Sequence, residues 1–233
     1  MKYRHELKFI INYREHALIR SRIKSLLSSD ANVDSDGSYT VRSLYFDDYY
    51  NNSYHDKRAG ILKRSKHRIR IYNQSDKTIR YEKKNKIGPY NLKQTAALTK
   101  EQFYGVLEGS YGVLLEGSDA LLNVFYHECM TNLMRPRVVA DYEREPYIME
   151  AGDVRITFDK NIRAGVEGFD IFNGDMSMVE ALDPGLLVME VKFMEFLPNI
   201  VRRILPSTAA NYTTVSKFIL CCEKTHRLRY SHI

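Results

Sequence analysis

The sequence contains few of the residue patterns that usually reveal a chemistry. Its three cysteines, Cys129, Cys221 and Cys222, are an odd number with an adjacent pair, so they fit neither a disulfide framework nor a zinc motif. The seven histidines show no metal-ligand spacing, and no glycine-rich nucleotide-binding motif of the usual kinds is present. We therefore expect buried cysteine thiols in a reducing compartment, and nucleotide recognition, if any, through the phosphates.

Long apolar segments are also missing. No stretch approaches the roughly 18 consecutive apolar residues of a membrane-spanning helix. The stretch from Met1 to Glu6 is charged and lacks the apolar run of a signal peptide. The expected location is the cytoplasm.

The composition is that of a folded, moderately basic protein. Of 233 residues, 44% are hydrophobic and 27% charged, which is enough apolar material for a core. The net charge of +6 favours a polyanionic partner, and nucleic acid, an anionic membrane and phosphate-rich small molecules all stay open. No linker or repeat divides the chain, so we expect one α+β domain over residues 1–233.

Hydrophobic periodicity and capping residues predict the elements. Capping boxes begin helices after Asn12, with Glu15, and after Thr99, with Gln102. Further helices are expected at residues 119–134, 197–205 and 213–226. The expected strands span residues 2–11, 39–46, 63–72, 78–85, 90–97, 137–144, 153–160, 179–181 and 187–196. Strands at both ends with helices between favour a largely antiparallel sheet.

The most informative pattern is charge that alternates with apolar residues along these strands. Arg68 and Arg70 share one face of their strand, since residues i and i+2 do so, and Ile69 lies on the other. The same alternation recurs at residues 4–8, 80–84, 142–144, 155–159 and 190–192. By parity, Lys84 rather than Lys83 shares the charged face with Glu82. One charged face therefore runs through about half a dozen strands.

Two arrangements fit this face: an open sheet with a wet surface, or a closed barrel with a charged lumen. The amphipathic helices must cover the apolar face, which places the charges inside. Unpaired buried cations would cost several kcal/mol each. The lumen is therefore expected to hold a polyanion, and its carboxylates a hard divalent cation such as Mg²⁺ or Mn²⁺.

Eight segments in chain order closely resemble the VTC domain, the polyphosphate polymerase branch of the triphosphate tunnel metalloenzymes. They are Arg4-His5-Glu6-Leu7-Lys8-Phe9, Val41-Arg42-Ser43-Leu44-Tyr45-Phe46-Asp47, Arg68-Ile69-Arg70-Ile71-Tyr72, Tyr81-Glu82-Lys83-Lys84, Tyr142-Glu143-Arg144, Val154-Arg155-Ile156-Thr157-Phe158-Asp159, Met189-Glu190-Val191-Lys192-Phe193 and Ser216-Lys217-Phe218. The resemblance covers residues 2–220. It implies a closed antiparallel β-barrel of about eight strands that forms a tunnel, with helices packed outside.

The resemblance also implies an activity: transfer of the terminal phosphate of ATP to a growing polyphosphate chain, with Mn²⁺ or Mg²⁺ as cofactor. It implies catalytic cations at five positions, Arg68, Arg70, Lys84, Arg144 and Arg155. Further phosphate-binding residues are implied at Lys8, Lys93, Lys192, Ser216 and Lys217. Glu190 is the implied metal ligand, with Glu6 and Glu82 as further candidates. ATP and polyphosphate or tripolyphosphate are the expected partners, and a membrane-protein partner in trans stays open.

Other functions compete with this one. An inorganic or nucleoside triphosphatase would use water as the acceptor, but the Glu-x-Glu-x-Lys start of those relatives is replaced here by Arg4-His5-Glu6-Leu7-Lys8. A non-catalytic polyphosphate-binding module is a further alternative, which the carboxylate of Glu190 disfavours. Nucleic-acid binding is disfavoured because, apart from Tyr72 and Tyr142, the basic faces lack aromatic side chains for base stacking.

Overall fold

The structure is a computed structural model that describes residues 5–30, 33–88, 90–206 and 213–230. Its strands are β1 (His5–Asn12), β2 (Ser28–Ser29), β3 (Tyr39–Asp47), β4 (Lys63–Tyr72), β5 (Ser75–Ile87), β6 (Tyr90–Leu98), β7 (Arg135–Met149), β8 (Val154–Gly165), β9 (Met178–Glu180) and β10 (Leu186–Phe193). Its helices are α1 (Tyr13–Ile23), α2 (Asn52–Arg58), α3 (Lys100–Leu107), α4 (Ala120–Thr131), α5 (Asn199–Arg202) and α6 (Lys217–Tyr230), with 3₁₀ turns η1 (Tyr111–Leu115) and η2 (Ala151–Asp153). Arg4, which opens the first resembling segment, and Pro89 lie outside the described residues.

Local sequence explains where the first helices begin. The side chain of Asn12 accepts a hydrogen bond from the backbone N–H of Glu15, whose carboxylate accepts one from the backbone N–H of Asn12. Thr99 and Gln102 form the same reciprocal pair at the start of α3. Both predicted capping boxes are confirmed, and each turns the chain directly from a strand into a helix.

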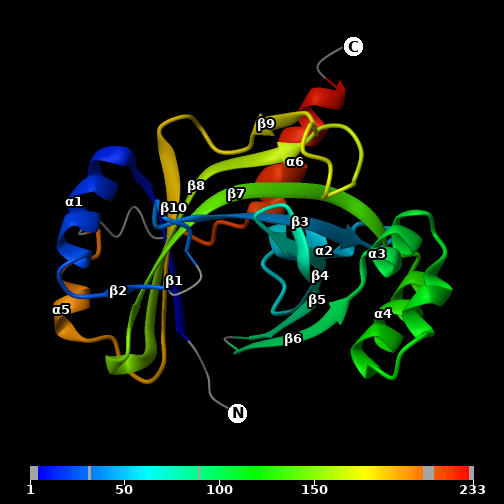
Figure 1. Cartoon of the computed structure of the whole chain (residues 1–233), viewed down its shortest axis with the longest axis horizontal. Coiled ribbons are helices and arrows are strands. Elements are labelled where there is room, and N and C mark those ends of the chain that lie inside the picture. The colour runs from blue at the N-terminus through cyan, green and yellow to red at the C-terminus, as the bar shows by residue number, and fades with distance from the viewer. Residues whose placement is uncertain (1–4, 31–32, 89, 207–212, 231–233) are drawn as a thin grey trace.

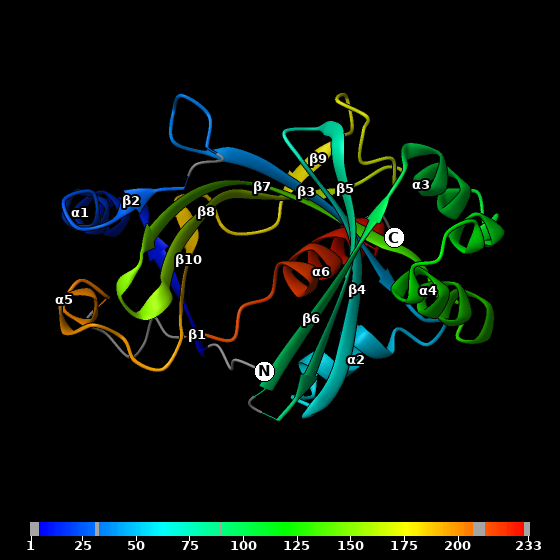
Figure 2. The same ribbon diagram turned by 60° about the horizontal axis from the view of Figure 1, so that its bottom comes forward.

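All strand pairs in the long sheet are antiparallel, in the order β1-β10-β8-β7-β3-β4-β5-β6. Figures 1 and 2 show that the sheet curves strongly, with β1 and β6 at its two edges. Among the described residues, hydrogen bonds do not connect β1 to β6, so they do not close the expected barrel. The antiparallel α+β class is confirmed, and the sheet is a curved, open one.

Helices cover the outer face of the sheet in two places. At the β3–β6 side, α3 and α4 pack on a core that includes Ile69, Tyr81 and Phe125. At the β1–β10–β8 side, α1 and α5 cover a second core that includes Ile156 and Val191. Along the strands, these apolar residues alternate with the charged ones. The charged side chains therefore point to the inner face.

The expectation that the helices pack outside is wrong for α6. Its residues Phe218, Cys221 and Cys222 are buried against Tyr45 and Tyr142, which lie on the inner face of β3 and β7. Figure 2 shows α6 between the two arms of the curved sheet. Because a helix with its side chains is about 10 Å wide, the sheet has to curve around it with a large radius. The large radius of curvature explains why the edge strands β1 and β6 stay apart.

Several boundaries differ from the sequence-based ones. The strand predicted at 137–144 extends over Arg135–Met149, and the one predicted at 153–160 continues to Gly165. Here β7 and β8 pair over most of their length, and this pairing keeps polar segments extended. The helix expected at 197–205 is only the single turn α5, and the last helix begins at Lys217.

Candidate functional site

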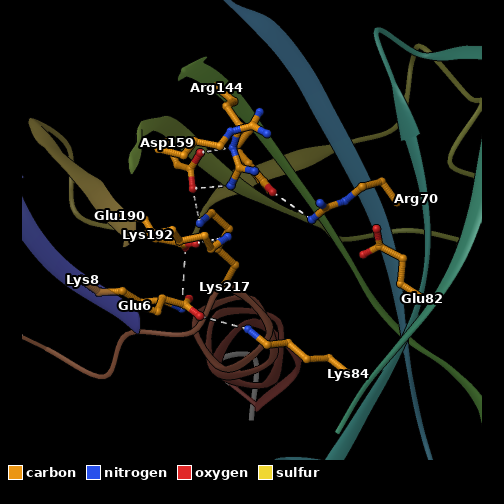
Figure 3. Close-up of polar contacts among 12 residues, drawn as sticks. Glu6, Lys8, Arg70, Glu82, Lys84, Arg144, Asp159, Glu190, Lys192 and Lys217 are labelled. Atoms are coloured by element: carbon orange, nitrogen blue, oxygen red, sulfur yellow. Dashed lines mark hydrogen bonds and ion pairs between the residues drawn. The ribbon is translucent and has the colours of Figure 1, made fainter. Parts of the chain in front are cut away.

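The inner face of the sheet gathers charged side chains from eight elements, β1, β4, β5, β6, β7, β8, β10 and α6. Figure 3 shows ten of them turned toward one another across the curve of the sheet. They form three groups of ion pairs and one arginine that has neutral partners. Most of the sequence-predicted site residues belong to these groups, and Arg155 and Ser216 lie outside them.

The first group joins β1 to β10. Lys8 Nζ lies 2.9 Å from Glu6 Oε1 and 3.8 Å from Glu190 Oε2, and Lys192 binds the other oxygen of Glu190. The second oxygen of Glu6 accepts a hydrogen bond of 3.1 Å from Lys84 Nζ. Two carboxylates and three ammonium groups therefore alternate in one chain of contacts (Figure 3).

Lys84 lies where strand parity predicts. Its neighbour Lys83 points to the opposite face, where its ammonium lies 2.9 Å from Glu128 of α4. Glu82 shares the inner face with Lys84, as expected for residues i and i+2. The alternation of side chains thus separates two adjacent lysines into an outer structural ion pair and an inner charged site.

The second group is centred on Glu82, which is 1% exposed. Arg68 Nε donates to Glu82 Oε2 at 2.6 Å, and Lys93 Nζ lies 2.5 Å from Oε1. Arg68 also donates to the hydroxyl of Tyr45 at 3.0 Å. Burial disfavours the carboxylate form of Glu82, but Arg68 and further cations hold its pKa well below its ordinary value. Glu82 therefore orients two cations with a permanent negative charge.

The third group joins β7, β8 and α6. Arg144 donates to both oxygens of Asp159, from Nε at 2.7 Å and from Nη2 at 2.9 Å. Lys217 Nζ lies 2.5 Å from Asp159 Oδ2 and 4.6 Å from the centre of the Tyr142 ring. Although burial raises the pKa of Asp159, Arg144 and Lys217 outweigh it and lower the pKa to about 2. Asp159 is thus a charged anchor for two site cations.

Arg70 differs from the other cations. It is 5% exposed, and its guanidinium donates to two neutral hydroxyls, Ser43 Oγ at 3.0 Å and Tyr142 Oη at 2.9 Å. Neutral acceptors orient the guanidinium without cancelling its charge. A buried cation in such a setting favours a bound anion.

Arg155 lies toward another part of the inner face. Its Nη2 donates to Asp30 at 2.7 Å and to the hydroxyl of Tyr39 at 3.2 Å. Glu190 pairs with Thr157, two residues further along β8. Arg155 is therefore held beside the first and third groups by a carboxylate of its own.

Ser216 lies at the start of α6, where its backbone carbonyl accepts the hydrogen bond from the N–H of Leu220. Its hydroxyl accepts a hydrogen bond of 2.8 Å from Lys66 Nζ. Ser216, Lys8, Lys84 and Glu6 line a pocket of about 400 Å³ that opens beside the ion-paired groups. The inner face is thus accessible from at least this side.

Sequence reasoning missed several contributors. Asp159 was part of a charged strand, but nothing in the sequence showed that it would anchor Arg144 and Lys217. Ser43 and Tyr45 alternate on β3 and face inward, yet from Tyr39 to Tyr45 this face of β3 carries no charged side chain that would signal a charged site. Lys66 continues the alternation of Arg68 and Arg70, and extending that pattern by one step would have identified it.

The described residues hold no cluster of three or more His, Cys, Asp or Glu side chains arranged for a metal ion. Glu6 and Glu190 nevertheless contact the same ammonium group, that of Lys8. Although burial raises the pKa of Glu190, Lys192, Lys8 and other cations hold it well below its ordinary value, so the group is a carboxylate. Two converging carboxylates fit a hard divalent cation that takes its remaining oxygen ligands from phosphate and water.

Within the described residues, none of the helices combines the length and the hydrophobicity that crossing a bilayer requires. A search of curated proteins finds no match to this chain. Solved structures, in contrast, do resemble it.

A candidate adenylyl cyclase from Hippeastrum, in which triphosphatase activity is dominant, superposes with a TM-score of 0.56 at 11% identity, over 96% of each chain. A candidate adenylate cyclase from Bacillus halodurans gives 0.49 at 11% identity, over 88% of this chain and 85% of its own. The protein PH1012 from Pyrococcus horikoshii gives 0.49 at 11% identity, over 94% and 99%. At this identity, the Hippeastrum structure shows a shared fold.

The family follows from the sequence profile. The profile of the VTC domain matches residues 3–226, which is nearly the whole chain and includes each of the ion-paired groups described above. The match confirms the resemblance inferred from the eight segments. This chain belongs to the VTC domain family.

Proposed function

We propose that this protein is a metal-dependent polyphosphate polymerase that transfers the terminal phosphate of ATP to a growing polyphosphate chain. The observation that carries this proposal is the convergence of cations on one inner face from strands at both sides of the sheet. They are Lys8, Arg68, Arg70, Lys84, Lys93, Arg144, Arg155, Lys192 and Lys217. A linear polyphosphate can contact several of these cations at once, each through a different phosphate.

Phosphoryl transfer suits this set of residues. The bond between the β- and γ-phosphates of ATP breaks, ADP leaves, and a terminal oxygen of the acceptor chain bonds to the γ-phosphorus. Catalysis of such transfers consists mainly of positioning and of stabilising negative charge. Arginines and lysines do both, and the protein needs no side-chain nucleophile.

Arg70 has the most direct role in this proposal. Its guanidinium is buried, and Ser43 and Tyr142 fix its orientation with neutral hydroxyls. An arginine fork binds two phosphate oxygens in parallel. Arg68 and Arg144 are held instead by the carboxylates of Glu82 and Asp159, so three guanidinium groups are positioned before the substrate binds.

Glu190 and Glu6 would hold the divalent cation, Mn²⁺ or Mg²⁺. When bound, the cation neutralises phosphate charge and fixes the position of phosphate oxygens. The ammonium of Lys8 contacts both carboxylates in the structure described here, so metal and lysine compete for them. Glu82 is engaged with Arg68 and Lys93 and serves better as their anchor than as a metal ligand.

A triphosphatase is the second candidate, favoured by the likeness to the Hippeastrum protein, in which triphosphatase activity is dominant. The two reactions share the cationic site and differ only in the acceptor, which is water in hydrolysis. A non-catalytic polyphosphate-binding module is the third candidate. It would need the cations but would have no use for a buried carboxylate such as Glu190.

One experiment separates the three candidates. The pure protein is incubated with γ-labelled ATP and Mn²⁺, and labelled polymer is separated from free phosphate. Polymer as the product supports the polymerase, and free phosphate as the sole product replaces it with the triphosphatase. If neither product forms and tripolyphosphate binds tightly, the result supports the binding module.

The variant Glu190→Gln controls for contaminating activity, because the proposed reaction depends on that carboxylate. Glu116→Gln is a matched control, since Glu116 is exposed at the end of η1, far from the inner face in sequence and structure. At a Mn²⁺ concentration that just saturates the wild type, product formation should fall sharply in the first variant and be retained in the second.

A further inference from the structure

The pocket of about 400 Å³ beside the ion-paired groups carries more cations than the site described so far. Besides Lys8 and Lys84, four half-buried basic residues line it, Lys57 from α2, Arg64 and Lys66 from β4, and Lys86 from β5. None of these four belongs to the segments that predicted the site residues. Lys86 continues the positive surface from Lys84 along β5, Arg64 and Lys66 continue it from Arg68 along β4, and Lys57 adds to it from α2.

This pocket has a strong charge imbalance. Glu6 is the one carboxylate among its described lining residues, against six basic side chains. Burial, together with repulsion from neighbouring cations, lowers the pKa of Lys66 well below its ordinary value, and the pKa values of Lys57 and Lys86 are lowered too, by burial first. Like charges are held together here at a cost that a bound polyanion would relieve.

Neutral hydrogen-bond donors complete the pocket. The start of α6 forms part of its wall, with Thr213, Thr214 and Ser216 among the lining residues. A helix N-terminus carries a partial positive charge and favours anions. Hydroxyl groups beside lysines are also common contacts for phosphate oxygens. Figure 2 shows this end of α6 between β1 and the arm formed by β4, β5 and β6.

The Arg155 side of the inner face contrasts with the pocket. There, Asp30 binds the guanidinium at 2.7 Å. Four residues further along the same face of β8, Asp159 pairs with Arg144 and Lys217. On that side, carboxylates offset basic residues, whereas in the pocket the positive charges exceed them. The surplus charge is therefore concentrated on one side of the inner face.

We propose that the pocket lined by Lys57, Arg64, Lys66 and Lys86 is a second anion subsite, which binds the phosphates of an inorganic polyphosphate chain beyond those held by the inner-face cations. This inference rests on the proposed function, since it concerns the same ligand class and the same path. It gives the protein a preference for long chains over tripolyphosphate. It also assigns one side of the inner face as the side on which the chain extends.

The test compares two ligands and two double variants. Dissociation constants for tripolyphosphate and for a length-fractionated long polyphosphate are measured without nucleotide or metal, so that nothing turns over. Lys57→Gln/Lys86→Gln removes two pocket charges and spares the inner-face groups. Lys24→Gln/Lys77→Gln removes the same charge from exposed positions just after α1 and on β5, which controls for net charge.

The wild type should bind the long chain more tightly than tripolyphosphate. The pocket variant should lose about tenfold in affinity for the long chain and stay within about twofold for tripolyphosphate, because surface charge pairs contribute modestly and additively. The exposed variant should change neither value by more than about twofold.

Equal losses for both ligands in the pocket variant, or equal effects of the two double variants, would overturn the subsite while leaving the proposed function intact. So would a wild type that binds both ligands equally. Failure of the wild type to bind either ligand would instead overturn the proposed function together with the subsite. Lys66→Gln, tested alone, should reproduce the loss of length preference, because Lys66 connects the β4 side of the pocket to Ser216 at the start of α6.

Discussion

Glu6 on β1 and Lys84 on β5 form an ion pair of 3.1 Å, although their strands are not neighbours in the sheet. β1 is one edge strand of the sheet, and β5 lies next to β6, the other edge strand. Side chains thus connect the two arms of the sheet where the described backbone forms no hydrogen bonds between its edges. The charged site itself holds the curved sheet around its own interior.

Replacing Arg70 by lysine should reduce kcat/KM for ATP about 100-fold. Lysine keeps the charge but loses the fork that contacts Ser43, Tyr142 and two phosphate oxygens, and hydrogen bonds to charged groups contribute about 1.5–3 kcal/mol each. Steady-state kinetics measure the effect, with Arg22→Lys on the exposed side of α1 as the matched control. A rate within a few-fold of wild type would remove Arg70 from the reaction.

Replacing Glu190 by glutamine should raise the Mn²⁺ concentration needed for half-maximal activity by at least about tenfold, since even outer partners of metal ligands change affinity by 10–100-fold. The amide is a weaker ligand and leaves Lys8 and Lys192 without their shared carboxylate. Activity is measured against Mn²⁺ concentration, with Glu116→Gln alongside. An unchanged metal requirement would assign the metal to other residues.

Replacing Asp159 by asparagine should destabilise the protein by about 3–5 kcal/mol, because it leaves two buried cations without their anion. Urea unfolding measures this loss. Tripolyphosphate supplies negative charge to Arg144 and Lys217, so it should raise the melting temperature of this variant more than that of wild type. Equal ligand-induced shifts in the two proteins would mean that the anion does not reach these cations.

The free energy of unfolding should decrease as the pH is lowered, because the buried His67 binds a proton less readily in the folded protein than in the unfolded chain. Burial lowers the pKa of His67 to about 4, whereas an unfolded histidine titrates near 6.5. Between these values the unfolded state binds the additional proton, so the free energy of unfolding decreases as pH falls through this window, by about 3 kcal/mol in total. Above about pH 6.5 this contribution is fully present.

His67→Gln should make the protein less stable near neutral pH and flatten this dependence, because glutamine does not titrate. Comparing urea unfolding of both proteins at about pH 7 and about pH 4.5 isolates the histidine from the carboxylates, which titrate in both. A difference between the two proteins that does not vary with pH would show that His67 does not cause the slope.

The alternation of charged and apolar residues predicted much of the site because one physical rule controls it. Once one face of a strand is buried under helices, residues two apart must share a face, and this rule separated Lys84 from Lys83. It also correctly predicted that Lys8, Arg70 and Glu190 point to the same inner face. Their phosphate- and metal-binding roles remain predictions.

The same rule did not predict where α6 would pack. Its apolar residues have helical spacing, but spacing does not tell a helix which face of a sheet to cover. The inner face turned out to be apolar where β3 and β7 meet, at Tyr45 and Tyr142, and there Phe218 is buried. The sequence also did not predict the ion-pair partners of the cations, such as Asp159. Which side chains meet across strands depends on the strand register, and the local sequence does not determine that register.

The position of α6 also has a consequence for folding. Lys8 comes from the first described strand and Lys217 from the last described helix, yet both help to lower the pKa of Glu190. Contacts between distant parts of a chain form late and slowly. The charged inner face is therefore incomplete until the residues of α6 have left the ribosome, so the proposed phosphate site forms only late in synthesis.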